Sequence, residues 1–226
     1  MTKFTQEKGI FITATGTDVG KTYISALLVK LLREKGVNCG YFKPALSGIS
    51  PDIESDVQYV SKVSGGGFTL EDNVSYSFED AVSPHLASFR AGEKISLDKI
   101  IKDYEKLSNK YDFIVVEGAG GITCPFDLSV TTLLLPDVIK ALGLDVIVVA
   151  DAGLGTINST LLTCEYAKSK SINVKGIILN NFDCDNFMHQ DNLEQVERLT
   201  GVKVVATVKS NATSLELDEC FKKGLV

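Results

Sequence analysis

The sequence predicts an α/β fold: a single domain, residues 1–226, built on a doubly wound and mostly parallel sheet. Three observations support this prediction. Short apolar runs alternate with stretches of helical periodicity, as they do where crossover helices join parallel strands. The first apolar run leads directly into a glycine-rich turn. The hydrophobic content of 44% and charged content of 23% are ordinary for a globular protein with a sizeable core.

The alternation assigns most of the chain to strands or helices. Strands are expected at residues 10–14, 39–42, 113–116, 145–150, 174–179 and 203–207. Helices are expected at residues 22–35, 55–63, 96–109, 132–142, 156–169 and 190–200. Gly36 ends the first helix, a capping box at Ser55 opens the second, and Pro136 is expected to kink or divide the fourth. Residues 64–78, with three consecutive glycines, are expected to form a loop.

Charge and hydropathy argue against several classes of function. The net charge of −6 disfavours broad nucleic-acid binding, which usually shows a basic excess. No apolar run approaches the ~20 residues that span a bilayer, and Met1–Lys8 lacks the apolar core of a signal peptide. We therefore expect a cytoplasmic protein that binds no nucleic acid and no membrane. The five cysteines contain no CxxC pair, so neither a zinc site nor a disulfide framework is expected.

The glycine-rich turn has the chemistry of a phosphate-binding loop. Gly20 permits close backbone approach, Lys21 offers a positive charge to terminal phosphates, and the Thr22 hydroxyl can bind Mg²⁺. The usual GxxxxGK[ST] pattern places its first glycine where this chain has Thr15, and here the glycine comes one residue later, at Gly16. The sequence therefore predicts a variant P-loop, and with it a fold of the P-loop NTPase type.

Chemically suggestive side chains follow several of the predicted strands, and in doubly wound sheets ligands bind beyond these strand ends. Glu117 can hold Mg²⁺ there, and we rank it above Asp151 because glycines follow it. Lys43 can neutralise charge on a transferring phosphoryl group, or it can be a solvated lysine. Asp56 can complete the Mg²⁺ shell or stabilise the start of a helix, and His85 can line a pocket or be structural.

Five segments, taken together, resemble the dethiobiotin synthetase family over nearly the whole chain. They are Ala14-Thr-Gly-Thr-Asp-Val-Gly-Lys-Thr22, Lys43-Pro-Ala-Leu-Ser-Gly48, Ser83-Pro-His-Leu-Ala87, Glu117-Gly-Ala-Gly-Gly121 and Gly153-Leu-Gly-Thr-Ile-Asn158, which continues to Leu161-Leu-Thr163. The resemblance implies an ATP- and Mg²⁺-dependent ligase of biotin biosynthesis. In this reaction CO₂ and an amine of 7,8-diaminononanoate give a carbamate, which attacks the γ-phosphate of ATP. The second amine then displaces phosphate and closes the ring of dethiobiotin.

The resemblance also implies roles for individual residues. Catalytic roles fall to Thr17, Lys21 and Lys43. ATP contacts fall to Asp18, Val19, Gly20, Lys21, Thr22, Tyr23, Asp56, Glu117, Gly118, Ala119, Gly120, Asn180, Asn181, Lys209, Ser210 and Asn211. Substrate contacts fall to Ser47, Gly155, Thr156 and Ile157, and Mg²⁺ ligation to Thr22, Asp56 and Glu117. The family further implies a homodimer with the site at its interface, residues 155–157 coming from the partner chain.

Two other classes of function compete with this one. Partitioning and membrane-surface switch ATPases resemble the chain in their loop and fold, but they carry a lysine where this chain has Gly16. They also end in a basic amphipathic tail, which residues 214–226 do not form. A catalytically inert nucleotide-binding module is the third class, and the grouping of Lys43, Asp56 and Glu117 near strand ends counts against it.

Overall fold

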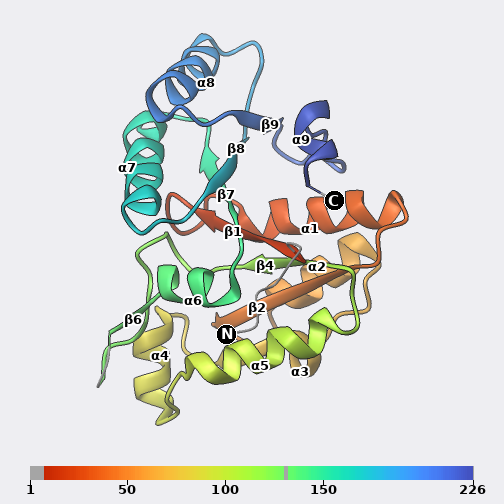
Figure 1. The fold of residues 1–226 in the computed structure, drawn as a ribbon, viewed down its shortest axis with the longest axis vertical. Helices are drawn as coiled ribbons and strands as arrows, with labels where there is room; N and C mark the ends of the chain where they lie inside the picture. The colour runs from red at the N-terminus through yellow and green to blue at the C-terminus, as the bar shows by residue number, and fades with distance from the viewer. Residues whose placement is uncertain (1–7, 130–131, 226) are drawn as a thin grey trace.

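The computed structural model describes residues 8–129 and 132–225, and strands alternate with helices throughout them (Figure 1). Residues 1–7, for which the sequence predicted no signal peptide, lie outside the described part of the chain. Within the described part, no helix is both long and apolar enough to cross a membrane.

Among the described residues, seven strands form one sheet in the order β3-β2-β4-β1-β7-β8-β9, and every neighbouring pair is parallel. These strands are β1 (Gly9–Ala14), β2 (Cys39–Ser47), β3 (Val74–Phe78), β4 (Phe113–Glu117), β7 (Val146–Asp151), β8 (Val174–Asn180) and β9 (Val204–Val208). β5 (Pro125–Asp127) and β6 (Leu133–Leu134) form a small antiparallel pair beside the main sheet. The predicted doubly wound α/β fold is therefore confirmed.

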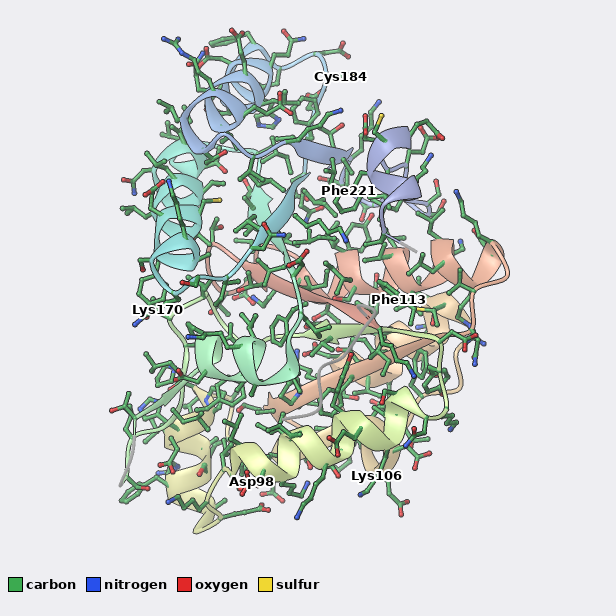
Figure 2. All side chains as sticks on the ribbon, viewed as in Figure 1. Asp98, Lys106, Phe113, Lys170, Cys184 and Phe221 are labelled. Carbon is green, nitrogen blue, oxygen red and sulfur yellow. The ribbon has the colours of Figure 1, made fainter. Side chains whose placement is uncertain are left out.

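Helices cover both faces of the sheet, as parallel strands require (Figure 1). They are α1 (Lys21–Glu34), α2 (Asp56–Ser64), α3 (Leu70–Asn73), α4 (Pro84–Ala91), α5 (Leu97–Ser108), α6 (Leu135–Leu142), α7 (Thr156–Ser169), α8 (Phe187–Thr200) and α9 (Glu219–Lys223). α1 packs against α2, and α7 packs against α8. All residues of β1 and β4 are buried, and side chains fill the space between the ribbons around Phe113 (Figure 2).

The predicted loop at residues 64–78 is wrong in its second half, which holds α3 and β3. The Thr69 side chain accepts a hydrogen bond from Asp72 N and so caps α3. Asn73 Nδ2 donates to Tyr41 O and ties this segment to β2. The three glycines indicated a flexible stretch, but β3 gains its order from pairing with β2, which composition does not reveal.

Two predicted helix boundaries are also corrected. α6 begins at Leu135, and Pro136 lies in its first turn, where a missing N–H costs nothing and no kink follows. α8 begins at Phe187 rather than 190, because the Asn186 side chain accepts from Met188 N and starts the helix earlier. The Ser55 capping box is confirmed: Ser55 Oγ accepts from Gln58 N, and Gln58 Oε1 accepts from Ser55 N.

β2 extends five residues beyond its predicted end because it changes neighbours along its length. It pairs with β4 up to Phe42 and with β3 from Lys43 to Ser47. Pro44 can lie in this strand because its missing N–H falls where the side facing β4 is no longer paired. As a result, Lys43 comes level with the last residue of β4 and residues 44–47 project past it, at the edge where the variant P-loop begins.

Gly9 tests the packing of the strand that leads into the P-loop. A Cβ at this position would lie 2.3 Å from the backbone oxygen of Ile114 on β4. Gly9→Ala should therefore lower the free energy of unfolding by roughly 1–3 kcal/mol, as overpacking does, measured by urea denaturation. Gly16→Ala is the matched control, since a Cβ there meets nothing within 4 Å, and it should stay within ~1 kcal/mol of the unmodified chain. Equal stability of the two variants would contradict the close packing of Gly9 against β4.

Candidate active site

A cavity of about 1060 Å³ opens at the carboxyl ends of the central strands. The P-loop, the end of β2 and the turn after β4 form its walls, together with residues 81–84 and 123–125. The predicted site residues that line it are Thr17, Asp18, Gly20, Lys21, Thr22, Tyr23, Lys43, Ser47, Asp56, Glu117, Gly118, Ala119 and Gly120. A cavity of this size accommodates a nucleotide together with a second small molecule.

The P-loop backbone is shaped for an anion. Gly20 has φ 97°, and a Cβ there would lie 2.2 Å from Asn180 Nδ2, so both conformation and space require glycine. α1 begins at the next residue with no side-chain cap and no acidic residue in its first turn. Its first N–H groups and the positive end of its dipole are therefore available to phosphate oxygens.

Lys21 is held beneath this loop. Its ammonium donates to Gly16 O at 2.8 Å, and the residue is only 8% exposed. Burial lowers the pKa of Lys21 below its usual value, although the nearby Glu117 carboxylate acts in the opposite direction. A partly desolvated ammonium of this kind interacts strongly with an incoming phosphate, because little solvent screens it.

Glu117 is the centre of the polar cluster in the cavity, and it is fully buried. Its Oε1 accepts hydrogen bonds from Thr22 Oγ1 at 2.8 Å and from Lys43 Nζ at 2.6 Å. Its Oε2 accepts from the Tyr41 hydroxyl at 2.9 Å. The P-loop, β2 and β4 thus meet on a single carboxylate.

Asp56 joins the same cluster from the first turn of α2. Its carboxylate forms an ion pair with Lys43 and lies near the Thr22 hydroxyl, whose proton is donated to Glu117. Burial favours the neutral acid, but the charge of Lys43 and the contact with its ammonium outweigh it and lower the pKa of Asp56. Burial likewise acts to lower the pKa of Lys43, yet Glu117 and Asp56 raise it above its usual value. Both groups are therefore charged at neutral pH.

The donor set fits Mg²⁺. Thr22, Asp56 and Glu117 converge around the Lys43 ammonium and offer one hydroxyl and two carboxylates, the oxygen ligands that Mg²⁺ prefers. The Lys43 ammonium already pairs with both carboxylates, so Mg²⁺ would have to share them with it. Asp151, the rival candidate, lies elsewhere: its carboxylate accepts from Gly153 N and from Asn181 Nδ2.

A second polar group forms where β8 and β9 end, beside the P-loop. Asn180 Nδ2 donates to Val19 O at 3.0 Å, while Asn180 Oδ1 is buried without a hydrogen-bond partner in the described chain. Ser210 Oγ donates to Asn181 Oδ1. An unpaired buried acceptor is costly, so Asn180 Oδ1 is suited to accept from a ligand donor such as an amino group. Lys209 and Asn211 flank Ser210, outside the residues that line the large cavity.

The remaining predicted site residues lie apart from the cavity. Gly155, Thr156 and Ile157 start α7 and are not among the described residues that line it. His85 is not a lining residue either, and its Nδ1 lies 3.0 Å from Ser83 Oγ, whereas Ser83 itself does line the cavity. The geometry therefore favours the structural interpretation of His85.

Two tyrosines of the site were missed from the sequence. Tyr59 lines the cavity from α2, one helical turn after Asp56. Tyr41 donates a hydrogen bond to Glu117 from β2. A usable signal existed for Tyr41, because residues two apart on a strand share a face and Lys43 is two residues away. Tyr59 at i+3 from Asp56 offers the equivalent helical signal.

Comparison with known proteins shows which family the chain belongs to. A family model described as an AAA domain matches residues 8–216. A protein named "ATP-dependent dethiobiotin synthetase BioD" from Clostridium botulinum (strain 657 / Type Ba4) is 49% identical over 214 residues, covering 93% of this chain and 94% of that protein. The protein of the same name from Brachyspira hyodysenteriae (strain ATCC 49526 / WA1) is 45% identical over 213 residues, covering 94% and 96%.

Solved structures show the fold at much lower identity. The MinD cell division protein of Aquifex aeolicus superposes with a TM-score of 0.56 at 13% identity, covering 90% of this chain and 83% of that chain. The septum site-determining protein MinD of Pyrococcus horikoshii OT3, complexed with Mg-ADP, gives 0.54 at 17% identity, covering 91% and 82%. Sequence identity close to one half over nearly full length is the stronger relationship, and it confirms the resemblance seen in the sequence. The chain therefore belongs to the AAA-domain family and, within it, to the family of ATP-dependent dethiobiotin synthetases.

Proposed function

We propose that this chain is an ATP-dependent dethiobiotin synthetase that joins CO₂ to 7,8-diaminononanoate and closes the cyclic urea, with release of ADP and phosphate. The observation that carries the proposal is the position of Lys43, between Glu117 and Asp56 and next to the P-loop. The names of the curated relatives support the overall reaction. The order of steps and the role of each residue are our proposal, taken from the resemblance to this family and placed on the site described above.

ATP would bind with its phosphates against the N-terminus of α1 and the Lys21 ammonium. Mg²⁺ held by Thr22, Asp56 and Glu117 would supply charge neutralisation to the phosphate oxygens. Asn180 Oδ1, which has no partner within the described chain, would accept from the purine amino group. Asn181 and residues 209–211 would border the base from the ends of β8 and β9.

The chain's own groups would then bring together the reacting atoms. CO₂ and one amine form a carbamate, whose oxygen attacks the γ-phosphate to give a carbamic–phosphoric anhydride. Lys43 would stabilise the charge that develops on the transferring group, and Thr17 would contact the same atoms from the loop. Ser47 Oγ, buried without a partner in the described residues, would bind an amine and orient it. The second amine then attacks the carbonyl carbon, and phosphate leaves as the ring closes.

A second copy of the chain would complete the site. α7 begins after Gly155, which has φ 93°, and no side chain caps its first turn. The N–H groups of residues 155–157 are therefore suited to a substrate carboxylate. Leu154 and Leu162, at 93% and 61% exposure, give this end of α7 an apolar surface that a partner chain can cover. We propose a homodimer in which this segment faces the cavity of the other chain.

Phosphate release separates the proposed reaction from simple ATP hydrolysis. With Mg²⁺ and ATP, release should require both 7,8-diaminononanoate and bicarbonate, because the phosphoryl acceptor is a carbamate formed from the two. A coupled phosphate assay with each component omitted in turn measures this dependence. Release that continues at the same rate without the diamine would exclude the synthetase reaction and favour a nucleotide switch.

Lys43→Ala tests the charge that faces the transferred phosphoryl group. Turnover should fall on the order of 10²–10³-fold, the usual loss when one transition-state donor is removed, while much of the ATP binding remains. Steady-state rates and calorimetric ATP affinity measure the two effects separately. Lys62→Ala, an exposed lysine on α2 paired with Glu54, is the matched control and should leave turnover unchanged. Unaltered turnover in Lys43→Ala would remove that residue from the mechanism.

A further inference from the structure

Tyr41 lies below the proposed metal site, on the same face of β2 as Lys43. The register pairs Tyr41 with Val115 and Phe42 with Val116, so Lys43 comes level with Glu117 at the end of β4. Tyr41 therefore reaches Glu117 diagonally, across neighbouring strands. The residue is fully buried, and its hydroxyl points into a region without solvent.

The hydrogen bonds to Glu117 are divided between its two oxygens. Thr22 and Lys43, which both line the cavity, contact Oε1. Tyr41 contacts Oε2 at 2.9 Å. Because Thr22 and Lys43 are themselves predicted to contact Mg²⁺ or the phosphoryl group, the Tyr41 bond is the contact to this carboxylate that ligand binding leaves in place.

The surroundings of Tyr41 fix the position of its hydroxyl. The ring packs against Phe68, with the two centroids 6.0 Å apart. Asn73 Nδ2 donates to the backbone oxygen of Tyr41 at 2.7 Å and holds the strand at this point. Because the ring and the backbone of Tyr41 are both held in place, its hydroxyl loses little conformational entropy when it donates to Glu117.

We propose that Tyr41 is a positioning residue that orients the Glu117 carboxylate for Mg²⁺, an inference that rests on the proposed function. The bond to Oε2 restrains rotation of the Glu117 carboxylate and keeps Oε1 directed toward Thr22 and Lys43. The tyrosine donor is neutral, so it fixes the carboxylate without cancelling the charge that attracts the cation. A lysine or arginine in its place would hold the same oxygen but weaken that attraction.

The test compares ADP binding with and without Mg²⁺ by isothermal titration calorimetry. Tyr41→Phe removes the hydroxyl and keeps the ring. In EDTA it should bind ADP as the unmodified chain does, since the phosphate-binding loop is untouched. With Mg²⁺ present, the gain in ADP affinity that the metal confers should shrink about tenfold, because a hydrogen bond to a charged group is lost from the site. The apparent Mg²⁺ requirement of turnover should rise in parallel.

Tyr104→Phe is the matched control, a buried tyrosine on α5 that should keep the full Mg²⁺-dependent gain. If the unmodified chain itself shows no such gain, the proposed metal site is wrong, whatever Tyr41 does. If the unmodified chain shows it and Tyr41→Phe retains it fully, the metal site stands and the positioning role is wrong. If Tyr41→Phe fails to fold, the double variant that carries both Tyr41→Phe and Glu117→Gln decides. Recovered folding supports the contact between Tyr41 and Glu117, and continued failure means that Tyr41 serves packing.

Discussion

The need to stabilise one buried carboxylate governs the arrangement of this site. Glu117 has no solvent exposure, and an ionised carboxylate in that position is tolerated only when donors surround it. Thr22 from the P-loop and Lys43 and Tyr41 from β2 supply these donors, so three segments distant in sequence must meet at fixed spacing. Lys43 in turn requires Asp56, because two carboxylates outweigh the cost of burying its ammonium. The same contacts that satisfy Glu117 thereby bring together the groups that we propose for cation binding and phosphoryl transfer.

Much of this could be predicted from the sequence, for local physical reasons. Apolar runs gave the buried strands of the sheet, and the order of Gly20, Lys21 and Thr22 gave the phosphate loop, since both signals lie within a few residues. A pattern could place Tyr41 on the face of Lys43, but its bond to Glu117, the order of residues 70–78 and the Asn180 bond to Val19 could not be derived, because each depends on a partner more than 30 positions away. Pro136 was misjudged because its effect depends on its position in the helix, which a pattern locates only to within a few residues.

The fold by itself does not select the reaction. The MinD structures superpose on this chain at 13–17% identity and establish only that the architecture is shared. The features that we propose as distinguishing are individual residues: Gly16, at the position where the sequence comparison led us to expect a lysine in switch ATPases, and Lys43, which lies between two acids at the strand ends. Lys43, placed on β2, lines the cavity of its own chain. This placement suits a small-molecule phosphoryl acceptor rather than a loop lysine that acts across a dimer.

Thermal unfolding of Lys43→Met, with and without Mg²⁺, tests most directly whether Glu117 and Asp56 form a cation site. Loss of the ammonium leaves both carboxylates without the ion-pair partner that they share, at a cost of about 3 kcal/mol or roughly 10 °C in Tm. Mg²⁺ should restore most of that loss and stabilise the variant more than the unmodified chain. In Lys43→Met with Glu117→Gln the restoration should largely disappear. A Mg²⁺ effect no greater in Lys43→Met than in the unmodified chain would contradict the account.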